Sequence, residues 1–144
     1  MAITAKRFGN ATLKALNKEV DWDTDTIKVM LCTSTYVPDQ DTHIYKSSIT
    51  NEVIGTGYTA GGVTLTTKTI GYTGATNVTK LDADDVTWAS STITARYAVI
   101  YVDTGVDATS VLLGYVDFGA DVSSTNGNFT ITWDAAGIFT DTAA

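Results

Sequence analysis

The chain is poor in the residues that most often carry out catalysis, with one cysteine and one histidine among 144 residues. A lone cysteine excludes an internal disulfide, and Cys32 stands in the apolar run "IKVMLCTS", where cysteine usually behaves as a small buried hydrophobe. A catalytic triad needs a base, and the usual base is histidine. His43 follows the polar stretch "DQDT" without a recognisable nucleophile motif. We therefore expect His43 to be a solvated loop residue and the protein not to be an enzyme.

Charge and long apolar runs are also scarce. Charged residues make up 17% of the chain, against about 25% in typical domains, and the net charge is −7. Nucleic-acid binding needs clustered Lys and Arg, so we expect no nucleic-acid partner. No stretch approaches the roughly 18 apolar residues of a membrane span, so we expect no membrane partner. The N-terminus lacks the apolar core of a signal peptide, which predicts synthesis in a cytoplasm.

Alternating, Thr-rich segments fill most of the chain. Apolar and small polar residues take turns along "VTWASSTITARYAVIYVDTG", the pattern of strands with one buried face. Similar segments recur with turn residues between them, and no helical pattern alternates with them. The sequence predicts a mainly β protein, a single-domain antiparallel β-sandwich or jelly roll with a short N-terminal helix or arm. The predicted strands are Thr26–Ser34, Val63–Ile70, Asn77–Asp84, Val86–Ala89, Thr92–Val102, Val111–Gly119 and Phe129–Trp133, with a last edge strand in the tail.

Three finer predictions concern this β-rich part. Thr92–Val102 carries apolar residues on both faces in its second half, which is typical of a central strand. Its alternation places Ala95, Tyr97, Val99 and Tyr101 on one face and Arg96, Ala98 and Ile100 on the other. We expect Gly55–Gly62 to be a flexible connector, and Ala120–Asn128 to be a loop that ends in an Asn-Gly turn.

Residues 1–20 are predicted as an N-terminal helix or arm, and residues 21–144 as the β-sandwich domain. Phe8, Leu13, Leu16 and Val20 recur at spacings near three and four, as in an amphipathic helix. The segment also holds four of the nine positive charges. Two interpretations stay open: a helix that caps the core, and a basic arm that reaches a partner.

Aspartates occur in short clusters, which are candidate calcium ligands. The run Asp21–Asp25 has aspartate at alternate positions, as in an EF-hand loop. That loop next requires Gly at its sixth place and Glu at its twelfth, where this chain has Thr26 and Cys32. The clusters Asp39–Asp41 and Asp82–Asp85 leave calcium binding in loops open, but acidic turns are common without metal. We predict no metal and no other cofactor.

Two further patterns resemble binding sites. "GTGYTA" matches a dinucleotide fingerprint on paper, but a strand pattern follows where a phosphate-binding helix would have to begin. The aromatic residues, with Trp22, Trp88 and Trp133 among them, suggest either a sugar-binding platform or core packing. Most stand at alternating positions within predicted strands, which favours the core.

Four segments taken together resemble a family of small virion structural proteins of tailed bacteriophages. The segments are "DWDTDTIKVMLCTSTYVPDQDTH", "GTGYTAGGVTL", "DADDVTWASSTITARYAVIYVDTG" and "LGYVDFGADVSSTNGNFTITWDAAGIF". The resemblance extends over nearly the whole chain and carries no catalytic motif. It implies a structural part of a phage particle, located in the virion, without indicating which part.

Physical reasoning narrows that choice. A small acidic β domain suits a capsid decoration (cement) protein that binds the major capsid protein and itself, as a homo-oligomer such as a trimer. The predicted contacts with the capsid or a neighbouring subunit are Lys6, Arg7, Phe8 and Lys14, aided by exposed sheet edges. The alternatives are a tail, neck or fibre-associated protein and a host-glycan-binding module.

Overall fold

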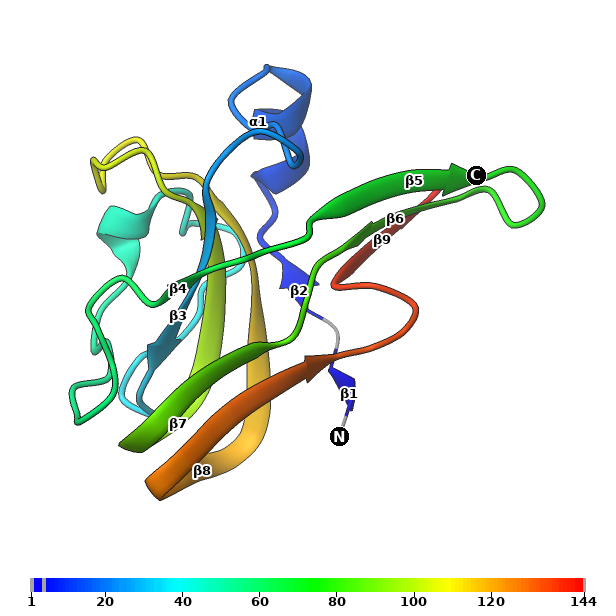
Figure 1. The fold of residues 1–144 in the computed structure, drawn as a ribbon. Helices are drawn as coiled ribbons and strands as arrows, with labels where there is room; N and C mark the ends of the chain where they lie inside the picture. The colour runs from blue at the N-terminus through cyan, green and yellow to red at the C-terminus, as the bar shows by residue number, and fades with distance from the viewer. Residues whose placement is uncertain (1, 4, 144) are drawn as a thin grey trace.

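The computed structural model describes residues 2–3 and 5–143 and shows a mainly β protein (Figure 1). The described part also contains the α-helix α1 (Ala11–Leu16) and the 3₁₀ turn η1 (Lys46–Ser48). The strands are β1 (Ala2–Ile3), β2 (Lys6–Arg7), β3 (Ile27–Cys32), β4 (Val63–Thr64), β5 (Thr69–Thr73), β6 (Val78–Asp82), β7 (Val86–Val102), β8 (Leu112–Trp133) and β9 (Phe139–Thr142). The prediction of an antiparallel, sandwich-like β domain with a short N-terminal helix is confirmed.

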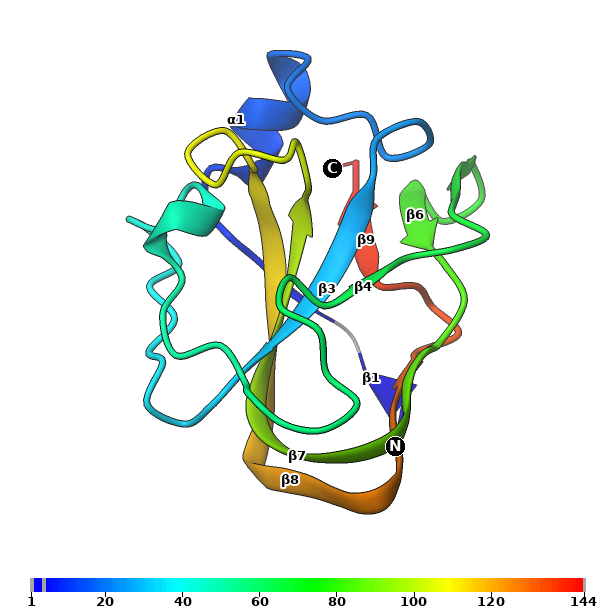
Figure 2. The ribbon, with the colours of Figure 1, turned by 60° about the vertical axis from the view of Figure 1, so that its left-hand side comes forward.

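The larger sheet is built around one long hairpin, β7–β8. Its strand order is β1-β8-β7-β3-β4, and β2 also pairs with β8. The pairs are antiparallel, except for the two-residue parallel pairing of β1 with the end of β8. Figure 2 shows the hairpin running down the molecule and turning sideways at its lower end. The smaller sheet, β5-β6-β9, is antiparallel throughout.

Bulges produce the turn in the long hairpin. Between the pairs Tyr97↔Asp117 and Ala95↔Val122, β8 advances five residues while β7 advances two. The surplus residues include Gly119, whose φ of +79° suits glycine. Extra residues on one strand bend it and increase its twist. The bent hairpin therefore forms a corner around the core instead of a flat sheet.

Both faces of the larger sheet are covered. The main core cluster gathers Ile27, Val29, Leu31, Ala98 and Ile100 with residues of the sideways part of the hairpin and of the smaller sheet. A second cluster on the opposite face is made by Phe8, Met30, Cys32, Tyr36, Val99, Tyr101 and Leu112. The central-strand prediction for Thr92–Val102 is thereby confirmed, because β7 lies between β8 and β3 and both faces of its second half, residues 98–102, are buried.

Bulges also account for one wrong face assignment. Tyr97, Val99 and Tyr101 share a face as predicted, but Ala95 belongs to the opposite cluster with Ala98. The register shift between Ala95 and Tyr97 breaks the alternation of period two. Alternation predicts faces only where the ladder is regular.

Three predicted boundaries are wrong for related reasons. Ala120–Asn128 is not a loop but the middle of β8, and Asn126 takes φ +48° inside the ladder. The two strands predicted on either side of Ser90 and Ser91 form one strand, β7, with Ser90 at φ +48°. Val63–Ile70 is divided between β4 and β5, because Thr67 takes φ +52° between them. In each case a non-glycine residue occupies the left-handed region.

The segment Gly55–Gly62, predicted as a flexible connector, makes close contacts with β3 and with Glu52. The Tyr58 hydroxyl donates to Glu52 and accepts from the Leu31 amide, at 2.7 and 2.9 Å. Gly62 has φ +79°, and a Cβ built there would lie 1.8 Å from the Val29 carbonyl oxygen. The glycines therefore allow the backbone to approach β3 rather than to move freely.

Candidate functional site

The N-terminal segment predicted to reach a partner lies against its own domain. Lys6 and Arg7 form β2 and pair with Tyr115 and Gly114 of β8. The Ala5 amide donates to Ile138 and the Phe8 amide to Leu113, each at 3.1 Å. The helix predicted from the spacing of Phe8 to Val20 is limited to Ala11–Leu16, because the chain before it is a strand.

The four predicted contact residues have different environments. Phe8 is 1% exposed and belongs to the second core cluster, so in this fold it does not present a contact surface. Lys14 donates to Glu19 and to the Tyr45 hydroxyl, and these hydrogen bonds, Tyr45 first, raise the pKa of Lys14. Arg7 lies over the Phe139 ring, with its guanidinium carbon 5.6 Å from the centroid. Lys6 is exposed. A contact role for the lysines and Arg7 stays a prediction.

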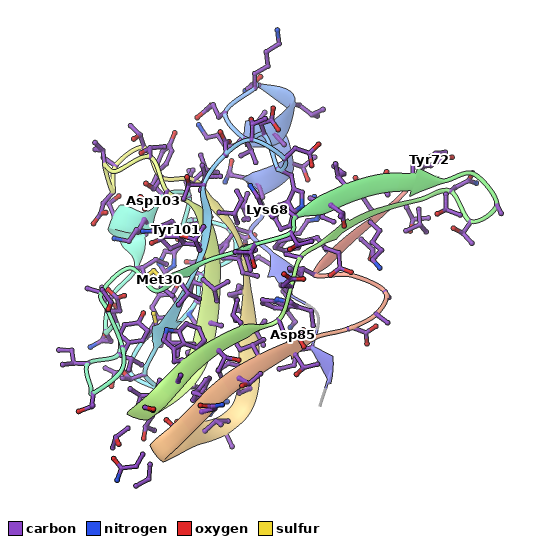
Figure 3. All side chains as sticks on the ribbon, in the orientation of Figure 1. Met30, Lys68, Tyr72, Asp85, Tyr101 and Asp103 are labelled. Carbon is purple, nitrogen blue, oxygen red and sulfur yellow. The ribbon has the colours of Figure 1, made fainter. Side chains whose placement is uncertain are left out.

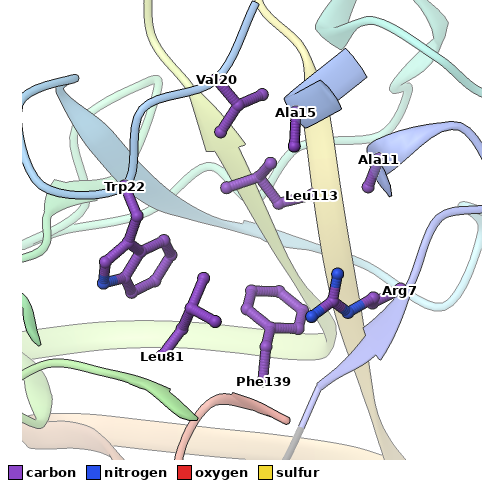
Figure 4. A pocket seen from close by; sticks show the side chains of 8 residues that line it. All are labelled: Arg7, Ala11, Ala15, Val20, Trp22, Leu81, Leu113 and Phe139. Carbon is purple, nitrogen blue, oxygen red and sulfur yellow. The ribbon is translucent and has the colours of Figure 1, made fainter. Parts of the chain in front are cut away.

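Arg7 also borders a small apolar cavity of about 50 Å³ where helix α1 meets both sheets (Figure 4). Trp22, Leu81 and Phe139 face Leu113 and the helix across this space. The volume is near that of one or two water molecules, and the walls are apolar. We interpret it as a packing seam between the layers and not as a ligand site.

A much larger hollow lies along the outer side of β8, with a volume of about 610 Å³. We call it the β8 groove. It is lined mainly by apolar and aromatic side chains, with Lys6 and Asp117 as its charged residues. The lining residues are Ile3, Lys6, Tyr115, Val116, Asp117, Phe118, Gly119, Val122, Phe129 and Thr130.

The groove exists because the short N-terminal strands cover only the two ends of β8. β2 pairs with Gly114 and Tyr115, and β1 pairs with Thr132 and Trp133. Between these points, no described strand pairs with the outer edge of β8. The bulge that contains Gly119 bends β8 there and hollows the surface. The site combines an open strand edge with an apolar wall, which is what an extended peptide requires.

Charged side chains fix one side of the groove. The Asp117 carboxylate accepts from Arg96 at 2.7 Å and from the Gly119 amide at 2.8 Å. These hydrogen bonds, Arg96 first, lower the pKa of Asp117, and the nearby Lys6 contributes. Asp117 therefore stays ionised and holds the bulged backbone, while Lys6 is the exposed cation of the rim.

Two of the three aspartate clusters considered for calcium cap turns, and in the third Asp84 accepts from the Thr67 hydroxyl and Asp85 from the Trp133 amide. Asp21 accepts from the amides of Asp23 and Thr24, and Asp39 accepts from those of Asp41 and Thr42. Such hydrogen bonds to the following backbone are typical of aspartate in turns. Among residues 2–3 and 5–143, no group of three or more Asp, Glu, His or Cys side chains is arranged to hold a metal ion.

Cys32 and His43 have structural environments. Cys32 is fully buried, and desolvation raises the pKa of its thiol to about 12. The expected solvation of His43 is wrong: it is half-buried, stacks on Tyr36, and its Nδ1 lies 3.0 Å from the Tyr36 hydroxyl. The polar loop that contains His43 folds back onto the Tyr36 ring. The sequence around His43 does not indicate this contact.

The three tryptophans lie in the main core, each at most 5% exposed. Trp22 and Trp133 donate to the carbonyl oxygens of Thr69 and Asp84. The core interpretation of these residues is confirmed. A sugar-binding platform would need other aromatic residues.

Comparison with protein-family models, curated proteins and solved structures finds no match for this chain. The resemblance to phage virion proteins therefore stays a prediction. In the described part of the chain, no helix has the length and apolar character needed to cross a membrane.

Sequence reasoning missed most of the β8 groove. Of its lining residues the sequence predicts only Lys6 as a contact, and it predicts a loop from Ala120 where the bulge lies. The signal was present in "VDFGADV", where a glycine interrupts an alternating strand, a mark of a β-bulge.

Proposed function

We propose that this chain is a non-enzymatic structural protein of a phage virion, a capsid decoration protein that binds the major capsid protein on the assembled shell. The observation that carries the proposal is the β8 groove. An extended segment of a shell subunit would add to the open edge of β8 and place apolar side chains on Val122 and Phe118. Main-chain hydrogen bonds to β8 would supply affinity, and the fit of side chains into the β8 groove would supply specificity.

Binding to the assembled shell would stabilise it by mass action. A ligand that binds only the assembled state adds free energy that grows with its concentration relative to its Kd. Lys6 at the rim favours a shell segment that carries an acidic residue beside its apolar ones.

Copy number in purified particles is the first test. Quantitative mass spectrometry of virions from the phage that encodes the chain should give hundreds of copies, near parity with the major capsid protein. A handful or a few tens of copies would replace decoration with a tail, neck or fibre role. Absence from the particle would overturn the proposal, and glycan binding would then be examined.

A matched pair of variants tests the groove itself. Val122→Asp places a charge in the groove, and Val106→Asp places the same charge in the β7–β8 loop; the two valines are 42% and 56% exposed. We expect Val122→Asp to lose binding to undecorated capsids in a sedimentation assay, and Val106→Asp to keep it. Equal binding by both variants would remove the groove from the contact.

A further inference from the structure

Strand β5 is exposed at every residue and forms the hairpin Thr69–Asp82 with β6, whose residues are half-buried. Figures 1 and 3 show it extending away from the body, with Tyr72 near its far end. All five residues of β5 are exposed, including Ile70 at 48% and Tyr72 at 60%. Because these two residues are two positions apart, they share one face of the strand. The hairpin thus presents an apolar pair to solvent at its outer edge.

β5 is also the terminal strand of its sheet. In the order β5-β6-β9, its outer edge has no strand partner among the described residues, so alternate backbone N–H and C=O groups there are free to pair. Natural edges are usually protected by proline, charge or a bulge. β5 contains neither proline nor a charged residue, and its register with β6 is continuous over five pairs.

The scarcity of charge on this hairpin suits contact with a second copy of the same acidic chain. The chain has a net charge of −7, so most contacts between two copies bring like charges together. From Thr66 to Thr79 the only charged residue is Lys68, whose ammonium group is turned to the Asp25 carbonyl. The hairpin is therefore a part of the surface on which a second copy meets little electrostatic repulsion.

We infer that two copies of this chain pair through β5, antiparallel about a twofold axis at Gly71. In this register Ile70 lies opposite Tyr72 of the second copy, and Thr69 lies opposite Thr73. Both apolar pairs fall on one face, and Lys68 lies opposite the uncharged Gly74. The two small sheets then form one continuous six-stranded sheet, in which the β5 edge of each copy is paired and β9 is the terminal strand at each side.

The size of the contact sets its strength. The hairpin offers 14 residues, fewer than the roughly 20–30 residues a side of a standard interface. The dimer is therefore weak in solution and concentration-dependent. On a shell surface, neighbouring copies are held at high effective concentration, and the same contact links them firmly. The inference deepens the self-association within the proposed function, but its test needs no capsid, so the two proposals fail separately.

Cysteine cross-linking tests the register. Opposed antiparallel residues have Cα atoms about 4.5–5.5 Å apart, within the range that a disulfide spans. Gly71→Cys sits on the axis, and a Cβ there meets no atom within 4 Å. We expect it to form a covalent dimer under mild oxidation. The wild-type chain serves as background, because its Cys32 is buried.

Thr73→Cys is the matched control on the same strand. In the proposed register the two Thr73 residues are four positions apart, about 13 Å, which is too far for a disulfide. It should not cross-link with itself, but should cross-link when mixed with Thr69→Cys. Equal cross-linking of Thr73→Cys and Gly71→Cys would indicate random collision and overturn the inference.

Sedimentation equilibrium gives an independent measurement without new cysteines. Ile70→Lys removes both Ile70–Tyr72 pairs and should weaken the dimer about tenfold. The double variant I70K/Y72E places opposite charges across the axis and should restore it. A wild-type protein that stays monomeric at the highest concentration, or an Ile70→Lys variant that dimerises like wild type, would overturn the inference.

Discussion

The two sheets of this protein differ in how much of each strand is buried. In β3 all residues except Lys28 are buried, whereas in β5 every residue is exposed. β3 is apolar at five of its six positions, whereas the only large apolar residues of β5 are Ile70 and Tyr72. β3 lies between two core clusters, and the hairpin formed by β5 and β6 extends beyond the body. The comparison separates a part that determines stability from a part that is free to bind.

The largest expected contrast comes from one residue type in the two settings. Ile100 is fully buried on β7, and Ile70 is 48% exposed on β5. Ile100→Ala should cost about 2–5 kcal/mol of unfolding free energy, because it leaves a cavity in a packed core. Ile70→Ala should change it by no more than about 0.5 kcal/mol. Urea denaturation at low protein concentration measures both, and equal losses would contradict the division.

A pair of glycines gives the next contrast. Gly62→Ala puts a Cβ against the Val29 carbonyl at a positive φ, so it should destabilise the fold by more than about 1 kcal/mol. Gly71→Ala adds a Cβ in open space. It should leave the unfolding free energy unchanged or raise it by up to about 1 kcal/mol, because alanine lowers the conformational entropy of the unfolded chain. Thermal unfolding of both variants checks the signs, and a stable Gly62→Ala would mean that the connector is not tightly held.

The smallest expected effect is on the stability of the fold at low pH. Lys28 on β3 lies 2.7 Å from Asp103, and its hydrogen bond, followed by that of the Gly105 amide, lowers the pKa of Asp103 below its ordinary 3.8. A lowered pKa adds stability that is present above pH 3.8 and is lost as the pH falls through the lowered value. Asp103→Asn should therefore flatten the loss of stability below about pH 4.

Urea titrations between pH 2 and pH 6 measure that slope. Asp141→Asn, at an exposed position on β9, serves as the control in the smaller sheet. A wild-type slope in the Asp103→Asn variant would show that the ion pair of the larger sheet does not contribute to acid sensitivity.

Prediction from sequence succeeded where the ladder is regular. The pattern of Thr26–Ser34 predicted β3, because a buried strand with no bulge keeps a strict period of two. It failed around Ser90 and Asn126, where non-glycine residues adopt positive φ within the long hairpin. There, cross-strand hydroxyl contacts such as Thr94–Ser123 at 2.7 Å sustain a strand through residues that are typical of loops. Such pairing depends on a partner 29 residues away and cannot be predicted locally.

The candidate site was predictable only in part. The exposed edges were anticipated in general terms, and Lys6 was identified from its charge. The groove depends on where β1 and β2 stop along β8, and that in turn depends on three-dimensional pairing. Phe8 shows the converse, because a hydrophobic residue in a basic segment was interpreted as a contact and is in fact core.

The pairing of the chain's beginning with its end has a consequence for synthesis. Ile3 pairs with Trp133, and the Ala5 amide donates to Ile138. β1 and β2 have no strand partner until β8 has been synthesised, more than 100 residues after them, so they cannot pair early in translation. Until β8 is made, these two short segments keep unpaired backbone groups, and partly synthesised chains would depend on chaperones to avoid pairing with one another.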